Sequence, residues 1–265
     1  MIQRVFAGLL AAGVVLGLAC VDMSAPKGPA SISNLVLPSP SVIVGDVMRD
    51  STGAPAPLSI AAYDANGAPL TGVAAQFFIT DSAKVAHLDA SNVLTGDQIG
   101  TVHIVGQVGA LQTSVATVPV TSAPSKMASS GKIDTLVVPL GADSALTTAF
   151  AAMSLLVTSA GDSASQGIVV RYSLAYAPAT HDGEPTAVYI ADNTGHVASA
   201  DTTSGSGSSS RRLVVTSAFL ADDALRGGQR TDSAVVEASA SYKGAALAGS
   251  PVRFVVPIKV ALKLQ

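Results

Sequence analysis

The sequence predicts an all-β protein that consists of two similar sandwich units. From residue 33 onward, short alternating or β-branched apolar segments are separated by clusters of Gly, Asp, Asn, Ser and Pro at intervals of roughly ten residues, as in all-β sandwiches. The chain also repeats its pattern after 95 residues. Helical periodicity is scarce, and the one competing segment is residues 145–157.

The composition limits the classes of function. Of the 265 residues, 48% are apolar, 12% are charged and 4% are aromatic, and the formal charge is −3. The apolar share is enough for one or two folded domains and excludes a disordered polyelectrolyte. Because there is neither a basic surplus nor an acidic tail, a nucleic-acid partner is not expected.

The first nineteen residues are typical of a signal peptide. Arg4 gives a short positive start, and residues 5–19 form an uninterrupted run of apolar and Gly residues. A helix needs about 20 apolar residues to cross a hydrocarbon core, so this run is too short for a permanent span. We expect residues 1–19 to be removed during export.

Cys20, the only cysteine, directly follows that run. The preceding LGLA at positions 16–19 resembles the lipobox of bacterial lipoproteins. The resemblance implies that Cys20 carries acyl chains such as palmitate and anchors the protein to a membrane, and that Val21 directs it to the outer membrane. Gly17 departs from the branched aliphatic residue that the family prefers. The alternative is an ordinary signal peptide with a leftover thiol.

The domain organisation follows from changes in composition. Residues 20–32 are poor in large apolar residues and carry Pro26, Gly28 and Pro29, which is typical of a tether. We expect a first β-sandwich over residues 33–122, a linker over residues 123–132 and a second β-sandwich over residues 133–265.

The repeat superposes residues 58–79 on residues 153–174. Each copy has two period-2 apolar runs joined by a polar turn that contains Gly, as two strands joined by a turn require. This match argues against a helix in the second half of residues 145–157. The side chains expected to face the two cores are Leu58, Ile60, Ala62, Val73, Ala75, Phe77 and Ile79, and then Met153, Leu155, Val157, Ile168, Val170, Tyr172 and Leu174.

Each copy also ends in alternating strands. Val102, Ile104 and Val108 share one face of residues 100–109, and residues 233–244 repeat this pattern. Residues 252–262 alternate most regularly. Pro257 cannot donate a hydrogen bond to a ladder, so the strand should lie at a sheet edge or bulge there.

These features together resemble the bacterial immunoglobulin-like domains of the Big type. The likeness lies in Gly45-Asp46, in the turn at residues 62–67, in residues 118–121 and, in the second copy, in residues 249–254. It implies two tandem Ig-like sandwiches at the cell envelope. Since the Cys pair and Trp of antibody domains are missing, the cores must depend on aliphatic packing with Phe77 or Tyr172.

The second copy is longer, and its additional residues fall in three segments: 177–186, 200–210 and 221–231. Their Ser, Gly and Asp content is typical of flexible loops rather than packed strands. Loops on a rigid sandwich are common sites of binding. We therefore expect these loops to contact a protein or glycan partner, with no specific binding residue identified.

Catalytic and cofactor motifs are not found. His87, His103, His181 and His196 have no metal-ligand spacing, and Gly161-Asp162-Ser163, which resembles a lipase and esterase motif, lies in a predicted turn. We expect neither an enzyme nor a cofactor. Carboxylates are denser in the second copy, and Asp192, Asp222 and Asp223 are weak calcium candidates because calcium prefers oxygen ligands.

The sequence thus predicts a membrane-anchored bacterial Ig-like lipoprotein with a non-enzymatic structural, adhesion or ligand-binding role at the cell envelope, on its periplasmic or surface side. One alternative is an accessory subunit of a secretion or polysaccharide-handling assembly. A second is a hydrolase hidden in the second unit.

Overall fold

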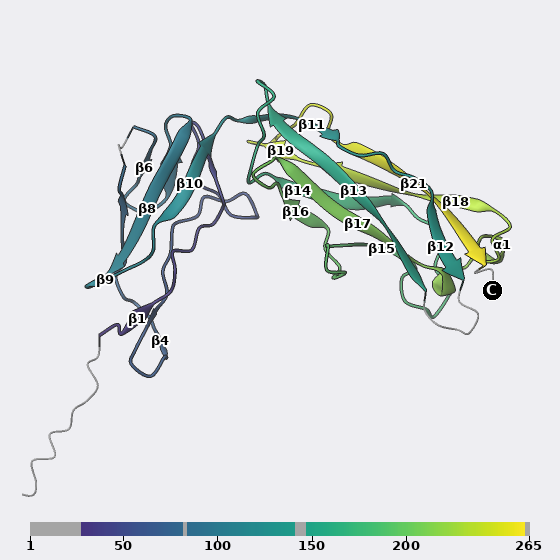
Figure 1. Ribbon diagram of the computed structural model, residues 1–265, viewed down its shortest axis with the longest axis horizontal. Helices are drawn as coiled ribbons and strands as arrows, with labels where there is room; N and C mark the ends of the chain where they lie inside the picture. Colours follow the sequence, from purple (N-terminus) through teal and green to yellow (C-terminus); the bar gives the residue numbers. More distant parts are fainter. Residues whose placement is uncertain (1–27, 82–83, 141–146, 263–265) are drawn as a thin grey trace, which may run out of the picture.

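The protein is built from two β-sandwiches that follow one another along the chain (Figure 1). The computed structural model describes residues 28–81, 84–140 and 147–262. Helical structure in this part is limited to the 3-10 turn η2 (Ser217–Phe219) and the single turn of α1 (Asp223–Arg226). No helix among the described residues is long and apolar enough to cross a membrane.

The first sandwich has one continuous sheet with the order β2-β10-β8-β5. These strands are β2 (Val42–Ile43), β10 (Ala116–Thr121), β8 (Gly100–Val108) and β5 (Gln76–Ile79), and β9 (Leu111–Gln112) also pairs with β8. The opposing layer is more fragmented: β6 (Ala86–Leu88) pairs with β7 (Leu94–Gly96), and single bridges join Val44 and Val47 to β7.

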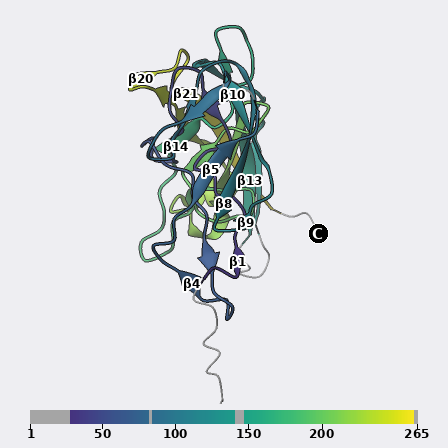
Figure 2. The ribbon, with the colours of Figure 1, turned by 90° about the vertical axis from the view of Figure 1, so that its left-hand side faces the viewer.

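A small sheet of β1 (Ser31–Ile32), β3 (Ala62–Tyr63) and β4 (Pro69–Leu70) lies at one end of the first sandwich. The second sandwich joins the opposite end, as the views in Figures 1 and 2 both show. The chain therefore enters the first sandwich far from the second.

The second sandwich has two long sheets. One has the order β11-β13-β17-β15 and the other has the order β12-β21-β18-β14-β16. The strands are β11 (Pro124–Ser129), β12 (Leu136–Leu140), β13 (Thr148–Ser159), β14 (Val169–Tyr176), β15 (Val188–Ala191), β16 (Ala200–Thr202), β17 (Ser208–Thr216), β18 (Thr231–Ser239) and β21 (Val252–Leu262). A hairpin of β19 (Ser241–Tyr242) and β20 (Ala245–Ala246) projects from it.

The strand order identifies both units as Ig-like. In each unit an early strand pairs in parallel with the last one, β2 with β10 and β12 with β21, and the last strand then pairs with its antiparallel predecessor. The second unit divides its strands as the A-B-E-D and C-F-G sheets of immunoglobulin domains do. The predicted fold class, all-β with two tandem Ig-like sandwiches, is confirmed.

The predicted inward residues form most of the second core. Met153, Leu155, Val157 and Val170 are fully buried and Tyr172 is nearly so, because period-2 alternation places them on the inward faces of β13 and β14, which belong to the two opposing sheets. The segment at 148–157 is accordingly a strand and not a helix. Leu174, which is the last residue before the register shift in β14, is the exception at 38% exposed.

The first core is smaller. Leu58, Ala62, Val102, Ile104 and Val108 are buried as predicted, and Met48, Leu94 and Val118 complete the core. The prediction for Val73 is wrong: it lies outside any strand, in the irregular segment before β5, and its side chain is exposed.

The predicted linker over residues 123–132 is wrong. Residues 124–129 form β11, which pairs with β13, and Met127 is 3% exposed in the second core. The small polar residues around Met127 are typical of a linker, but they are equally compatible with a strand that places Met127 in the core and its neighbours at the surface. The connection between the sandwiches shrinks to Ser122 and Ala123.

The prediction that β21 lies at a sheet edge at Pro257 is confirmed for the part of the strand that contains the proline. β21 lies between β12 and β18, so it is not an edge strand as a whole. Its pairing with β12 starts at Ile258, one residue after the proline. Pro257 therefore occupies the part of β21 that has a free side, where a missing N–H costs no ladder hydrogen bond.

Candidate functional site

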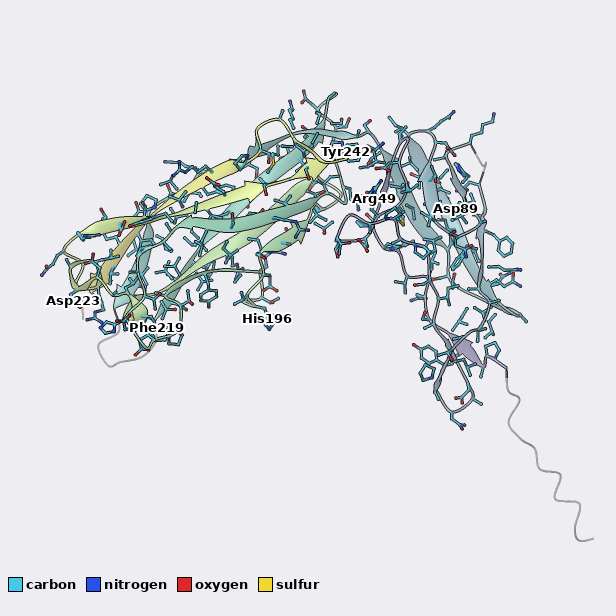
Figure 3. All side chains as sticks on the ribbon, turned by 180° about the vertical axis from the view of Figure 1, so that it is seen from behind. Arg49, Asp89, His196, Phe219, Asp223 and Tyr242 are labelled. Atoms are coloured by element: carbon cyan, nitrogen blue, oxygen red, sulfur yellow. The ribbon has the colours of Figure 1, made fainter. Side chains whose placement is uncertain are left out.

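The three predicted loops lie in two different places. Residues 177–186 and 221–231 meet at the end of the second sandwich that is farthest from the first, near the labelled Phe219 and Asp223 (Figure 3). The His181 N–H donates to the Phe219 carbonyl at 2.8 Å, and the Ala221 N–H donates to the Ala179 carbonyl at 2.9 Å. We refer to residues 177–186 and 217–231 as the distal loops.

The distal loops are packed rather than flexible. Asp222 caps α1 by accepting from the Leu225 N–H at 2.9 Å, and Leu225 is completely buried in the second core. Arg230 forms ion pairs with Asp222 at 3.1 Å and Asp232 at 3.0 Å. A buried leucine and a bridged arginine therefore hold a segment that composition alone assigned to a flexible loop.

The third segment, residues 200–210, is mostly strand. It contains β16, the start of β17 and a tight turn between them, and Ser209 is 2% exposed. Around the turn, the hydroxyls of Ser204, Ser206 and Ser208 lie 2.8–3.0 Å from one another. The flexible excursion predicted here is wrong because serines alternate into the sandwich as readily as they form loops.

The calcium candidates are not brought together. Asp192 directly follows β15, whereas Asp222 and Asp223 belong to the distal loops. Figure 3 shows Asp223 far from His196, which lies in the same turn as Asp192. Asp223 pairs with Arg226, so its charge is already engaged. Among the described residues no group of three or more His, Cys, Asp or Glu side chains could hold a metal ion.

Asp192 is instead the first residue of a hairpin turn. Its Oδ1 accepts from the Thr194 N–H at 2.8 Å, the Thr194 hydroxyl at 2.7 Å and the His196 N–H at 3.0 Å. Hydrogen bonds from Thr194 are the main cause that lowers the pKa of Asp192 to about 2. The carboxylate is saturated by its own turn.

The same turn recurs along the chain. Asp50, Asp64 and Asp89 each accept from the backbone N–H groups two and four residues later. In all four turns the fourth residue has a positive φ: Gly53, Gly67, Asn92 and Gly195. The aspartates that looked like free loop carboxylates therefore have a structural role in hairpins.

The histidines are surface side chains with local partners. His87 Nδ1 lies 2.7 Å from Asp97, and His103 Nδ1 lies 2.7 Å from Asp81. His196 Nδ1 is 2.8 Å from the Thr194 hydroxyl and 3.8 Å from Asp192. A catalytic triad needs the hydroxyl and the carboxylate on different ring nitrogens, so this contact belongs to the turn.

Two predicted sites remain: the esterase-like segment at residues 161–163 and the lipidation site at Cys20. Gly161-Asp162-Ser163 lies in the turn after β13, where Asp162 has a φ of 60° and pairs with Lys126, so Ser163 is not placed as a nucleophile. Cys20, the predicted lipidation site, lies outside the described residues.

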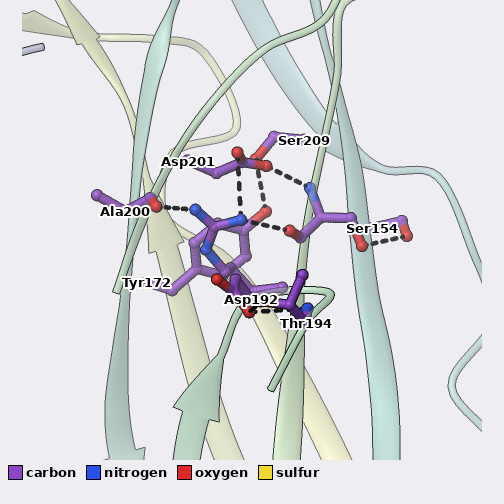
Figure 4. A network of polar contacts seen from close by, with 9 residues as sticks. Ser154, Tyr172, Asp192, Thr194, Ala200, Asp201 and Ser209 are labelled. Atoms are coloured by element: carbon purple, nitrogen blue, oxygen red, sulfur yellow. Dashed lines mark hydrogen bonds and ion pairs between the residues drawn. The ribbon is translucent and has the colours of Figure 1, made fainter. Parts of the chain in front are cut away.

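A polar network that the sequence reasoning missed joins the two sheets of the second sandwich (Figure 4). The Tyr172 hydroxyl on β14 is 2.9 Å from Ser209 on β17, whose hydroxyl donates to Asp201 on β16 at 3.0 Å. Arg211 pairs with Asp201 at 3.2 Å and donates to the Ser210 and Ala200 carbonyls. Burial is the main cause that raises the pKa of Tyr172 to about 12, and the negative charge of Asp201 adds to this increase.

The missed signal was the alternation along β17. Ser209, Arg211, Leu213 and Val215 occupy every second position, and the last two are completely buried. An arginine in that series must point toward the sandwich, where it needs an acceptor. Asp201 on the adjacent strand provides one.

A polar cleft of about 170 Å³ lies between the two sandwiches. Its walls come from residues 39–53 of the first unit and from residues 166–171 and 241–242 of the second. A neighbouring pocket of about 340 Å³ shares Ser39, Arg49 and Gln166 with it. Both pockets lie at the joint between the units.

Asp46 is the buried charge of this cleft, at 6% exposed. It accepts from Arg49 at 2.9 and 3.3 Å and from the Val47 N–H at 2.9 Å. Burial acts to raise the pKa of Asp46, but hydrogen bonds from Arg49 and Val47 outweigh it, so the pKa is below its usual value. Burial and then the Asp46 charge raise the pKa of the neighbouring Tyr242 to about 12.

Comparisons with known proteins found similar folds only. No protein-family model matches the chain, and no curated protein matches it. Domains 4 and 5 of the S-layer protein SbsC are 14% identical, with a TM-score of 0.30 over 88% of this chain and 99% of that one. The adhesin InvE of Yersinia pseudotuberculosis is 16% identical, with a TM-score of 0.32 over 88% of this chain and 60% of that one.

Invasin, a bacterial integrin-binding protein, is 11% identical, with a TM-score of 0.27 over 88% of this chain and 40% of that one. This chain therefore spans less than two thirds of InvE and of the invasin structure. At these TM-scores the similarity supports no inference about activity or partners, and the Ig-like assignment depends on the strand order described above.

Proposed function

We propose that this chain is a lipid-anchored bacterial envelope protein of the Big type, with a non-enzymatic adhesion or structural role, which presents the distal loops to a partner. The observation that supports this proposal is the path of the chain. β1 lies at one end of the first sandwich, and the distal loops lie at the far end of the second (Figure 1). An anchor before β1 would leave the distal loops at the free end.

The anchor is Cys20, after removal of residues 1–19. Between Cys20 and β1 there are ten residues, which reach at most about 35 Å when extended. Such a tether would hold the first sandwich close to the outer membrane while allowing it to turn.

The contact surface is the acidic exposed part of the distal loops. Asp182 and Glu184 are exposed there, on a scaffold that is fixed by Leu225 and Arg230. Binding sites of this kind, in which loops are held by a rigid sandwich, lose little conformational entropy when a protein or glycan docks.

Metabolic labelling tests the anchor. Cells that express the full chain are given labelled palmitate, and the wild type is compared with Cys20→Ser. We expect label in the wild type and none in the variant. Equal labelling of both proteins would disprove anchoring at Cys20.

A binding assay tests the contact surface. The chain is presented on beads and mixed with purified peptidoglycan sacculi, with outer-membrane vesicles and with intact cells. We expect Asp182→Asn/Glu184→Gln to weaken binding to at least one of these probes. Asp134→Asn/Glu237→Gln, which removes the same two charge types elsewhere on the second sandwich, should not. Equal binding by both variants would exclude the distal loops.

A further inference from the structure

The covalent connection between the sandwiches is very short. β10 of the first sandwich ends at Thr121, and β11 of the second begins at Pro124, so only Ser122 and Ala123 separate two paired strands. Proline further limits the backbone at the start of β11. Two residues between anchored strands leave little freedom for one unit to turn against the other.

Non-covalent contacts cross the same boundary. The Ser41 hydroxyl of the first unit donates to the Gln166 carbonyl of the second at 2.9 Å, and Ile43 packs against the second core. A Cβ at Gly167 would lie 2.7 Å from Ser41 Oγ and 2.8 Å from Ser39 Oγ. The backbone of the second unit therefore approaches the first closely enough that Ser39 and Ser41 would have to move to admit a side chain at Gly167, whose φ of 78° also favours glycine.

The β19–β20 hairpin supplies further contacts across the cleft. Lys243 Nζ donates to the Gly45 carbonyl at 3.3 Å. Tyr242 lines the cleft together with Asp46 and Arg49, and Figure 3 shows Tyr242 and Arg49 close together at the junction. Arg49 holds Asp46 in place, so the hairpin meets a surface that is already ordered.

We propose that the two sandwiches form one stiff unit, in which the two-residue connection, the hydrogen bond from Ser41 to the Gln166 carbonyl, and the latch of Tyr242 and Lys243 on residues 45–49 fix the angle between them. These contacts come from two separate segments of the second unit, residues 166–167 and 242–243, so a change of the angle has to break contacts of at least one segment. This inference is independent of the anchor and of the partner.

A fixed angle has a consequence for binding. A stiff tandem presents its far end at a set distance and orientation relative to its near end, and it loses less entropy on binding than a hinged one.

Spin-label distance measurements test the joint. Because Cys20 is the only cysteine, a full chain with Cys20→Ser, Ala90→Cys and Asn193→Cys carries two labels, both at exposed turn positions, one in each sandwich. We expect a single narrow distance distribution. Tyr242→Ala/Lys243→Ala should make that distribution about twofold broader, because only the short connection and the Ser41 side remain.

Two further variants make the outcome decisive. Tyr176→Ala/Lys259→Ala removes the same residue types from the second sandwich away from the cleft and should keep the narrow distribution. Insertion of Gly-Gly-Ser-Gly-Gly between Ser122 and Ala123 defines the breadth of a freely jointed pair, with circular dichroism to verify folding. The proposal is overturned if the distance distribution of the parent chain is as broad as that of the insertion variant. It is also overturned if the distribution of Tyr242→Ala/Lys243→Ala is as narrow as that of Tyr176→Ala/Lys259→Ala.

Discussion

The buried carboxylate of Asp46 is stabilised by hydrogen bonds, and its substitution tests how much they contribute to the free energy of unfolding. Asp46→Asn removes a charge that Arg49 and the Val47 N–H both bind. We expect a loss of about 1–2 kcal/mol in the free energy of unfolding at neutral pH, since Arg49 remains partly solvated. Urea denaturation measures this loss. Asp134→Asn, at a side chain that is 84% exposed, is the control and should change little.

The pH dependence of that difference has a defined sign. The pKa of Asp46 is lowered from 3.8 in the folded protein, so its contribution is complete above the unfolded value and is lost as the pH falls through the folded pKa. The difference between wild type and Asp46→Asn should therefore stay constant near neutral pH and shrink as the pH falls below the unfolded value of 3.8. A difference that stays constant would contradict a stabilising role for the ionised carboxylate.

The Tyr172 hydroxyl gives a second test at the residue scale. Tyr172→Phe deletes its contact with Ser209 inside the network and should cost about 1 kcal/mol. Because the pKa of Tyr172 is raised from 10.0 to about 12, its contribution is complete below pH 10 and is lost as the pH rises through the folded value. Denaturation at neutral and alkaline pH measures both effects. Tyr176→Phe, at an exposed tyrosine, should change stability by less than about 0.5 kcal/mol.

At the scale of elements, the hairpin turns decide where the strands pair. The turn between β16 and β17 contains two glycines with different constraints. Gly207 has a φ of 74°, and a Cβ there would lie 2.5 Å from the Val157 carbonyl oxygen on β13. Gly205 has no atom closer than the Gln166 Oε1 at 3.8 Å. One turn therefore offers both a test position and its control.

We expect Gly207→Ala to lower the free energy of unfolding by about 2–4 kcal/mol, because it combines a left-handed backbone with a clash against a paired strand. Gly205→Ala should be neutral or slightly stabilising, since it restricts only the unfolded chain. Thermal denaturation of the two variants compares them directly. Similar losses in both would show that this turn is not packed against β13.

At the scale of the whole molecule, the two sandwiches have unequal cores. The first relies on strands that are mostly two to six residues long, whereas β13 and β21 of the second have 12 and 11 residues. More apolar surface is buried in the second, and stability follows buried apolar area. The first sandwich should therefore be the less stable of the two.

Tryptophan reporters can separate the two transitions because the chain has no Trp. We expect Phe77→Trp in the first sandwich to report unfolding at a urea concentration about 1 M lower than Phe219→Trp in the second. Coincident midpoints would mean that the joint couples the two units into a single cooperative transition.

The sequence by itself determined the all-β class, the tandem repeat and most inward positions. These depend on local rules: period-2 alternation buries Met153, Leu155 and Val157 together, and Asp followed by Gly three residues later forms the hairpin turns. It could not separate loop from strand where serines and alanines dominate, as at residues 124–129 and 200–210, because those residue types are compatible with both.

Only the tertiary structure decided which distant residues meet. The loop carboxylates are taken up by turns, caps and arginines, so Asp192, Asp222 and Asp223 do not form one site. Asp201 meets Arg211 where the two sheets of the second sandwich face each other, and Tyr242 reaches the segment of Asp46 and Arg49 across the joint. The physical reason is that alternation fixes the face on which a side chain lies, while the neighbour it contacts depends on register and on the joint between the sandwiches.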